Sequence, residues 1–241
     1  MVPPDRHAQI VPYQNPFTMC GRYSLIVTDD LGARFRVHIP TLGLRSRFNV
    51  PPGSEMPVVL CEGGTRRMEC AEWGLVPSWA KGGSFGRQLI NARAETVTEK
   101  PAFRSAFRHH RCLVPASGFY EWKEVGGTRL PYYYHLTGDA YFSFAGIANV
   151  VVEGGRRSLL TYAIITTDAS PLVSPVHPRM PVILQEEDEE AWIDPGTETQ
   201  HLRSLLIPYP GEDLEVHRVS KEVNDAKAEG PGLIAPIKEW W

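Results

Sequence analysis

The chain has 241 residues, of which 42 % are hydrophobic, and a formal net charge of −3, so it can bury a substantial core. No apolar run is long enough to cross a bilayer and the start lacks an apolar signal segment, so we expect a soluble, cytoplasmic protein. The four cysteines show no metal-ligand spacing, which argues against a zinc site and against a disulfide framework.

The near-neutral total conceals an asymmetry along the chain. Residues 20–131 contain 16 Lys and Arg against 10 Asp and Glu, whereas residues 132–241 contain 8 against 17. A basic half is what phosphate binding uses, but the two halves could equally pair with each other in the fold. Composition alone leaves both interpretations open.

The first third of the chain begins with residues 1–18, which are rich in proline and have no apolar period. We expect them to be a disordered leader or a mis-assigned start. After them the pattern predicts a strand at 23–27, a short helix at 30–36, a loop at 47–53, a hairpin of strands 56–61 and 66–73, and a rigid aromatic loop at 73–79.

The remaining two thirds alternate short apolar runs with turns. They predict a short strand ending at 90, a helix from an N-cap at Thr98 to about 109, and a strand at 111–115, after which 116–122 crosses a glycine into another strand. Further strands are predicted at 131–136, 141–148, 160–167, 182–184 and 214–219, with a polar hairpin at 153–157 and two exposed acidic or amphipathic helices at 186–192 and 197–206. Many short strands and few helices predict a single α+β domain over 19–241, dominated by antiparallel sheet or barrel with a few peripheral helices.

Met19-Cys20-Gly21-Arg22 is unusual because of its position. If translation began at Met19, or if the leader were cut away, removal of the methionine would leave a free N-terminal cysteine. That group carries an α-amine and a thiol on adjacent carbons, which together close a thiazolidine ring on an aldehyde. Inside a continuous chain the nitrogen of Cys20 is an amide without this chemistry, and the residue could then be simply a small buried hydrophobe.

Five motifs connect this stretch to the rest of the chain: Cys-Gly-Arg at 20–22, Trp-Gly-Leu-Val-Pro at 73–77, Asn-Ala-Arg-Ala-Glu at 91–95, Gly-Phe-Tyr-Glu-Trp at 118–122 and His-Pro-Arg-Met-Pro at 177–181. In order and approximate spacing they resemble the SRAP family, the SOS-response-associated peptidase-like proteins that shield abasic sites in single-stranded DNA. The resemblance extends from residue 19 to about 219. The leader departs from it, because family members begin at Met-Cys.

The resemblance implies an enzyme that crosslinks itself covalently to abasic sites in single-stranded DNA, protecting them from nucleases. Cys20 would provide the amine and the thiol. We expect no cofactor, no membrane partner, a monomer, slight sequence specificity and, if the chain is bacterial, association with the nucleoid. Two alternatives stay open, a cysteine-type peptidase or autopeptidase with Cys20 as nucleophile, and a non-covalent reader of modified DNA bases.

The proton transfers of this reaction assign three further catalytic candidates. Glu121 lies between aromatic residues that would desolvate it and raise its pKa, although an arginine could instead neutralise it. His177 can donate or accept a proton near neutral pH, and the resemblance assigns it help with sugar ring opening and adduct reversal. Asn91 has a donor and an acceptor for the amine and the sugar, or it could serve a structural turn.

DNA contacts are expected from arginines, whose planar guanidinium matches phosphate. We predict Arg22 and Arg93, each close to a catalytic candidate, then Arg179, and we expect Asn49 and Pro51 to line the groove.

Two tryptophans, Trp73 and Trp79, could stack on bases or wedge the strand open. Large aromatic residues beside Gly and Pro also serve as core anchors, so the sequence leaves both roles open for each of them.

Overall fold

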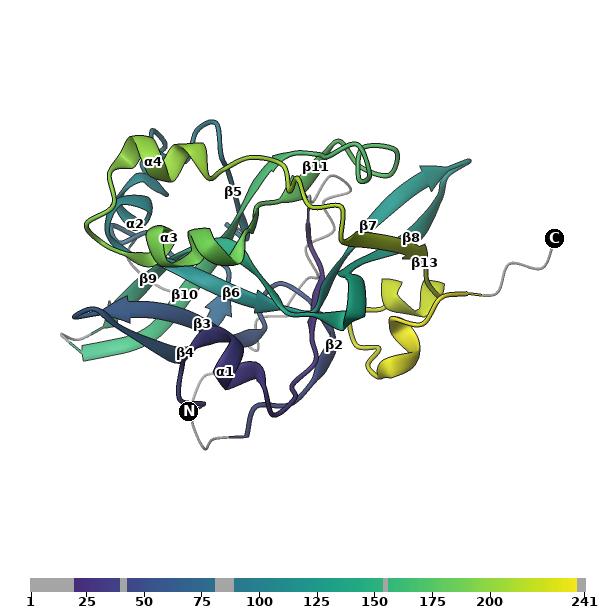
Figure 1. Cartoon of the computed structure of the whole chain (residues 1–241), viewed down its shortest axis with the longest axis horizontal. Coiled ribbons are helices and arrows are strands. Elements are labelled where there is room, and N and C mark those ends of the chain that lie inside the picture. Colours follow the sequence, from purple (N-terminus) through teal and green to yellow (C-terminus); the bar gives the residue numbers. More distant parts are fainter. Residues whose placement is uncertain (1–19, 40–42, 81–88, 154–155, 238–241) are drawn as a thin grey trace, which may run out of the picture.

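The computed structural model describes residues 20–39, 43–80, 89–153 and 156–237. Two β-sheets form its centre, and a few short helices surround them (Figure 1). The first sheet is antiparallel throughout, in the order β13-β8-β7-β1-β2. Its strands are β1 (Tyr23–Leu25), β2 (Arg47–Val50), β7 (Gly118–Val125), β8 (Thr128–Leu136) and β13 (Leu214–Arg218).

The second sheet runs in the order β11-β10-β4-β3-β6-β9-β12. Its strands are β3 (Glu55–Glu62), β4 (Thr65–Trp73), β5 (Asn91–Arg93), β6 (Arg111–Ala116), β9 (Phe142–Glu153), β10 (Arg156–Asp168), β11 (Arg179–Pro181) and β12 (Ile183–Leu184). Because β9 and β10 also pair, strands β10, β4, β3, β6 and β9 close into a small barrel. The pairings of β10 with β4 and β5 are parallel.

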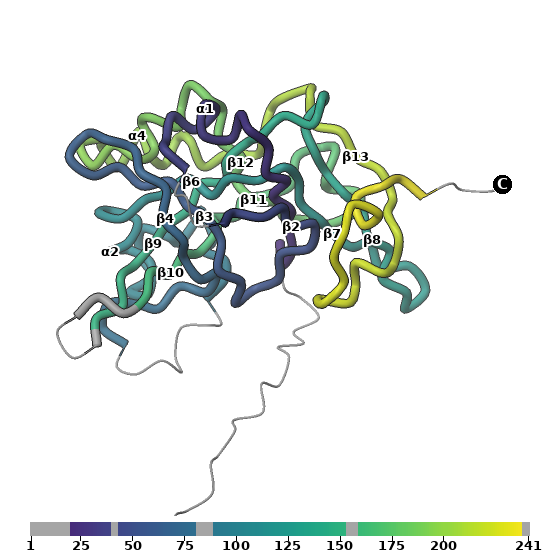
Figure 2. The backbone as a smooth tube through the Cα atoms, turned by 90° about the horizontal axis from the view of Figure 1, so that it is seen from below, coloured from purple at the N-terminus to yellow at the C-terminus, as the bar shows by residue number. Residues whose placement is uncertain are grey.

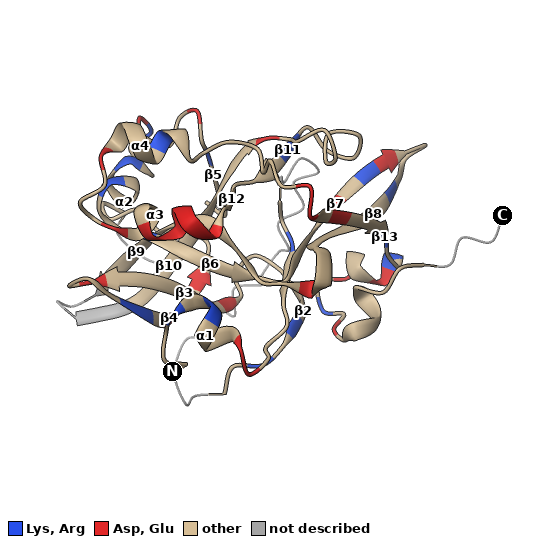
Figure 3. Ribbon diagram, viewed as in Figure 1, with Lys and Arg blue, Asp and Glu red and all other residues tan. Residues whose placement is uncertain are grey.

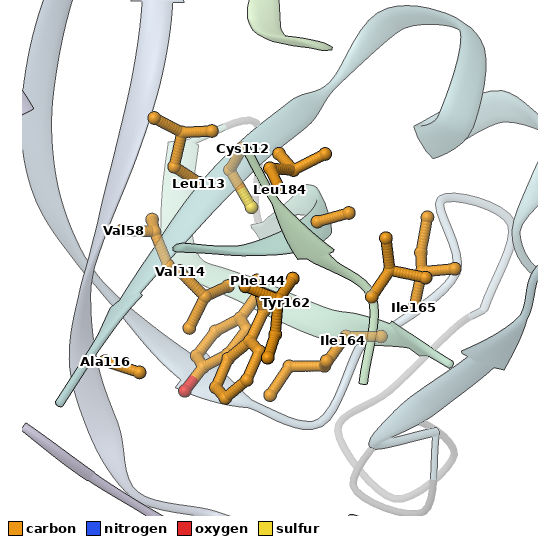
Figure 4. Packing of buried hydrophobic residues seen from close by; sticks show 14 of the residues in the cluster. Val58, Cys112, Leu113, Val114, Ala116, Phe144, Tyr162, Ile164, Ile165 and Leu184 are labelled. Atoms are coloured by element: carbon orange, nitrogen blue, oxygen red, sulfur yellow. The ribbon is translucent and has the colours of Figure 1, made fainter. Parts of the chain in front are cut away.

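One apolar core joins the two sheets and contains most of the buried side chains. Figure 4 shows its part inside the second sheet, where Val114 of β6, Phe144 of β9 and Tyr162 of β10 point toward one another. The hydroxyls of Tyr23 and Tyr162 satisfy each other across this core at 2.7 Å. Alternation along each strand explains the arrangement, since every second residue of a half-buried strand faces the core.

The helices are short and peripheral: α1 (Leu31–Phe35), α2 (Arg104–His109), α3 (Glu189–Ile193) and α4 (Thr199–Ser204), with one-turn 3₁₀ segments at Thr137–Asp139, Glu186–Asp188, Lys221–Asn224 and Pro231–Leu233. The predicted α+β class, dominated by antiparallel sheet, is confirmed. Within the described part of the chain, none of the helices has the length and apolarity that a membrane crossing needs.

Three expectations about local structure were wrong. Residues 47–50 form β2 instead of a loop, because residues before a proline favour extended backbone and Val50 pairs with Tyr23. The helix expected from Thr98 begins only at Arg104, after a series of turns. The segment 186–192 is not fully exposed, since Glu189 and Trp192 are buried.

Other expectations fall on positions that the structure does not describe. The predicted leader lies outside the described residues, as does the tip of the hairpin at 154–155.

The segment after β13 returns to the first sheet and lies beside β2, β7 and β8 (Figure 2). Nε2 of His217 lies 2.7 Å from the carbonyl oxygen of Ile234, and the Phe48 amide donates to the carboxylate of Glu229 at 2.9 Å. These contacts join the segment after β13 to β13 and β2, the two outer strands of the first sheet.

Candidate active site

Cys20 and Glu121, separated by 101 positions in the sequence, meet directly. The backbone N–H of Cys20 donates to Oε1 of Glu121 at 2.8 Å, and the two residues are 4 % and 2 % exposed. Cys20 adopts a left-handed backbone conformation (φ 42°), which is uncommon for a residue other than glycine. The nitrogen that would become the α-amine therefore already lies at hydrogen-bond distance from a buried carboxylate.

Strand alternation determines what surrounds Glu121. Its sequence neighbour Tyr120 belongs to a separate apolar cluster on the opposite face of the first sheet, together with Tyr133. Phe119 and Tyr134, on the same face as Glu121, pack in the main core with Cys20. The prediction that Glu121 is desolvated is correct, but the aromatic side chains responsible lie two positions away or on the next strand.

Gly118, which begins the motif, allows this packing. A Cβ atom there would lie 2.2 Å from the Tyr133 ring, so a larger residue fits only if that ring moves.

Burial changes the acidity of both groups at the centre. It raises the pKa of Glu121, an effect that His177 and the hydrogen bond from Cys20 partly oppose. Burial, reinforced by the charge of Glu121, also holds the pKa of the Cys20 thiol well above its ordinary value. Glu121 is therefore a better proton donor near neutral pH than an exposed glutamate, and the sulfur is a neutral thiol instead of a thiolate.

His177 completes the group from the loop before β11. Its Nδ1 lies 4.0 Å from Oε2 of Glu121 and 3.1 Å from the backbone nitrogen of Arg179. Because Nδ1 also lies 3.0 Å from the carbonyl oxygen of Arg179, it can donate there or accept the Arg179 N–H, depending on which ring nitrogen carries the proton. The imidazole is partly exposed, so it forms the boundary between the buried carboxylate and solvent.

Asn91 approaches Cys20 from the second sheet. Its Nδ2 donates to the carbonyl oxygen of Cys20 at 3.4 Å, and β5 holds it through parallel pairing with Ile164. All four predicted catalytic residues therefore lie around one point, where the two sheets meet.

Arg22 is the best-defined of the predicted DNA contacts. Its Nη1 donates to Oδ1 of Asn49 at 2.6 Å and to the carbonyl oxygen of Val223 at 2.9 Å, while its guanidinium lies 5.9 Å from the Trp122 ring centroid. Its Nε has no hydrogen-bond partner among the described residues. Burial lowers the pKa of Arg22 from its usual value, yet an arginine keeps its charge near neutral pH.

Asn49 does not line a groove as predicted, because it is fully buried. Besides Arg22, its amide binds the carbonyl oxygens of Asp225 and Ala228, both at 2.9 Å. Its hydrogen bonds connect β2 and Arg22 to the C-terminal segment. Sequence inspection had no signal for this role, since the carbonyl groups come from residues more than 170 positions away.

The other predicted polar contacts differ in availability. Arg93 ends β5 and is exposed, and Pro51 is partly exposed in the turn after β2. Arg179 is largely occupied, because it pairs with Glu95 and with Asp168, the latter at 2.9 Å. A phosphate at Arg179 would have to compete with both carboxylates.

The two tryptophans differ clearly in their exposure to solvent. Trp73 is fully buried, stacks on Tyr162 with 6.3 Å between centroids, and donates from Nε1 to the carbonyl oxygen of Ile90 at 2.9 Å. It is a core anchor and cannot stack on a base in this conformation, so that prediction is corrected. Trp79 is 54 % exposed, and its Nε1 donates to the carbonyl oxygen of Pro101 at 3.4 Å.

Among the described residues, no group of three or more His, Cys, Asp or Glu side chains could hold a metal ion.

Comparison with known proteins adds an independent line of evidence. Residues 19–226 match the family model described as SOS response associated peptidase (SRAP). The chain is 38 % identical over 221 residues to the abasic site processing protein YoqW of Bacillus subtilis, covering 90 % of this chain and 99 % of the relative. It is 31 % identical to the abasic site processing protein HMCES of Mus musculus, covering 90 % and 76 %.

Solved structures share the fold. A protein from Bacteroides thetaiotaomicron matches with a TM-score of 0.81 at 27 % identity, covering 91 % of this chain and all of the other. A phage-related protein from Bordetella bronchiseptica matches with a TM-score of 0.67 at 28 % identity, covering 84 % and 95 %.

Proposed function

Because the chain belongs to the SOS response associated peptidase (SRAP) family, we propose that it forms a covalent thiazolidine crosslink with abasic sites in single-stranded DNA. The curated relatives named abasic site processing proteins support DNA with abasic sites as the partner. In this proposal the crosslinking species begins at Cys20, after residues 1–19 have been removed, and the adduct shields the lesion from nucleases.

The observation that carries the proposal is the 2.8 Å hydrogen bond from the Cys20 nitrogen to Glu121. An α-amine in the same place would have its proton acceptor within reach, which is the first requirement for general base catalysis. Glu121 could take a proton from the ammonium form, so that the neutral amine attacks the aldehyde carbon of the open-chain deoxyribose.

The order of the remaining steps follows from the acidities. Attack by the amine gives a carbinolamine, and a proton from Glu121 lets its hydroxyl leave as water, which forms a Schiff base. The Cys20 thiol then adds to the same carbon, its proton returns to the carboxylate, and the thiazolidine ring closes. One water is released in total. Since burial keeps the sulfur protonated, the amine reacts first and the thiol second.

The surrounding groups fit the roles that this chemistry needs. His177, at the partly exposed edge, can exchange protons between Glu121 and solvent or the sugar. Arg22 and Arg93 are the phosphate contacts, because neither forms an ion pair with a carboxylate among the residues described. Trp79 is the stacking residue, since its ring is exposed.

A cysteine peptidase would need a different arrangement around the sulfur. There an imidazole activates the thiol. In the described part of this chain, Glu121 is the ionisable neighbour that acts on the Cys20 thiol, and it favours the protonated form.

The test is intact-protein mass spectrometry before and after incubation with a single-stranded oligonucleotide that contains one abasic site. A chain produced from Met19, with the methionine removed, should gain the oligonucleotide mass less one water. The 241-residue chain that retains its leader should gain nothing. Cys20→Ala should lose the heat-stable adduct while its α-amine still gives a Schiff base that borohydride traps.

Three outcomes would contradict the proposal. A heat-stable adduct of Cys20→Ala would exclude the thiazolidine. Turnover of an unrelated peptide without any DNA adduct would favour the peptidase. Salt-dependent and wholly reversible binding to intact DNA would favour a reader of modified bases.

A further inference from the structure

Tyr134 of β8 is a buried polar residue that the chemistry above does not use. It is 0 % exposed, and its ring stacks on Phe119 with 4.8 Å between centroids and 11° between planes. Its hydroxyl has no hydrogen-bond partner among the described residues. Tyrosine hydroxyls that are buried usually find a partner, because an unsatisfied one loses its hydration without compensation. The unused hydroxyl therefore requires an explanation.

Strand register places Tyr134 on the face that carries Glu121. In the β7–β8 pair, Phe119 lies opposite Tyr134 and Glu121 lies opposite Tyr132, so Tyr134 is the diagonal neighbour of Glu121. Diagonal positions across antiparallel strands are within reach of an aromatic side chain. Cys20, Phe119 and Tyr134 also pack in the same apolar cluster.

The electrostatics agree with this placement. Burial raises the pKa of Tyr134 most, and the nearby carboxylate of Glu121 raises it further. The phenol stays neutral at any pH at which DNA would be bound, so its oxygen is a permanent hydrogen-bond acceptor.

The hydrogen-bonding capacity of Cys20 changes when the leader is removed. As an amide, its nitrogen has one hydrogen, and Oε1 of Glu121 accepts it. As an α-amine it has two hydrogens, or three when protonated, and a single carboxylate oxygen does not satisfy them. A buried donor needs a further acceptor.

We propose that the Tyr134 hydroxyl is a positioning group that accepts a hydrogen bond from the free α-amine of Cys20. With one N–H directed at Glu121 and another at Tyr134, the nitrogen lone pair of the neutral amine points along a single direction, toward the incoming aldehyde. The hydroxyl lacks a partner in the described residues of the uncut chain because its partner is the amine that processing creates. This inference rests on the proposed function, which supplies the free amine.

Tyr134→Phe is the informative variant, since it keeps the ring on Phe119 and removes only the oxygen. With the chain that begins at Cys20, we expect crosslinking to an abasic oligonucleotide to slow about tenfold at saturating DNA. A rate change of this size is usual when one hydrogen bond to a charged or reacting group is lost. DNA affinity and the thermal midpoint should remain those of the wild type.

A second measurement does not depend on crosslinking. Accepting a hydrogen bond stabilises the ammonium form, so the pKa of the α-amine, followed by its ¹⁵N chemical shift, should be lower in Tyr134→Phe than in the wild type. Tyr133→Phe is the matched control. It removes a phenol hydroxyl from the next residue, on the opposite face, where it is bonded to Ser24 Oγ at 2.8 Å, and it should leave the amine pKa and the rate unchanged.

The outcomes separate the two proposals. An unchanged amine pKa and an unchanged rate in Tyr134→Phe would overturn the role of Tyr134, whatever the wild type does. A lower amine pKa with no adduct even in the wild type would support the role of Tyr134 and reject the crosslinking function. Equal shifts in Tyr133→Phe and Tyr134→Phe would show a general effect of the sheet and would also overturn the assignment.

Discussion

Two of the glutamates whose burial the structure describes are almost completely buried, and their surroundings are opposite. Glu189, at the start of α3, is 1 % exposed and receives two hydrogen bonds from Arg34 at 2.9 and 3.0 Å and one from Ser143 at 2.7 Å, with Arg66 at 3.6 Å. Glu121 is 2 % exposed, and none of the described arginines forms an ion pair with it. Its contacts are a backbone N–H and an imidazole at 4.0 Å.

Burial alone therefore does not identify a catalytic carboxylate. Glu189 has two arginine partners and a serine donor, and through them it joins α1, β4, β9 and α3. Glu121 bears the desolvation cost without such a partner, which raises its pKa and leaves its proton free to move. The difference lies in which groups neutralise the charge, and it can be tested with one substitution at each position.

The largest effect is expected from Glu121→Gln in the crosslinking reaction. The amide keeps the shape of the side chain but cannot transfer a proton, so the rate at saturating abasic DNA should fall about 1,000-fold, within the usual range for general acid–base catalysis. DNA affinity should be retained. Loss of the folded state in circular dichroism, or a rate within a few-fold of the wild type, would contradict the assignment.

The same variant has a defined pH signature in stability. Because the folded pKa of Glu121 lies above its ordinary value of 4.5, the folded chain binds the proton more tightly, and wild-type stability falls as pH rises from that value through the folded pKa. Glu121→Gln lacks this loss. In denaturant titrations, the free energy of unfolding of the variant should therefore increase relative to that of the wild type as pH rises. Below the ordinary pKa of glutamate this relative increase should be absent.

Glu189→Gln should lower stability and leave the crosslinking rate unchanged, which is the opposite of what we expect for Glu121→Gln. Removing one partner of a buried ion pair leaves Arg34 and Arg66 without their shared carboxylate, and the free energy of unfolding at neutral pH should fall by about 3 kcal/mol. Figure 3 shows that acidic residues gather along α3, but the exposed ones cannot replace a buried contact. At a temperature where the variant is folded, its crosslinking rate should equal that of the wild type; a slowed rate would make Glu189 more than structural.

The smallest effect is expected at Asn49, which acts through Arg22. Asn49→Ala should weaken binding to single-stranded abasic DNA about tenfold, because Arg22 loses the acceptor at 2.6 Å that fixes its guanidinium. Fluorescence anisotropy in a salt series measures this. In the double variant with Arg22→Ala, the loss should not exceed that of Arg22→Ala alone. Additive losses would mean that Asn49 affects binding by another route.

Sequence patterns predicted where strands occur, but they predicted the ends of the strands and the loops less well. The hairpin of β3 and β4 follows from two apolar runs around Gly63 and Gly64, both of which have positive φ. β2 was missed because prolines after Val50 indicated a loop, whereas its pairing with Tyr23 is a long-range event. The buried end of α3 was missed for the same reason, since the partners of Glu189 are Arg34 and Arg66.

The sequence by itself determined the chemical groups of this protein: a cysteine that cleavage after Met19 would make N-terminal, a glutamate in an alternating strand, and a histidine and an asparagine in ordered motifs. Only the tertiary structure decided which of these groups come into contact and which polar groups are already occupied by other partners. It placed the Cys20 nitrogen on Glu121, withdrew Trp73 and Asn49 from any contact with DNA, and put Tyr134 on the face of Glu121. The reason is physical. Residue type fixes what a side chain can donate, accept or titrate, but burial and partners, which set its pKa and its availability, depend on strands brought together from distant parts of the chain.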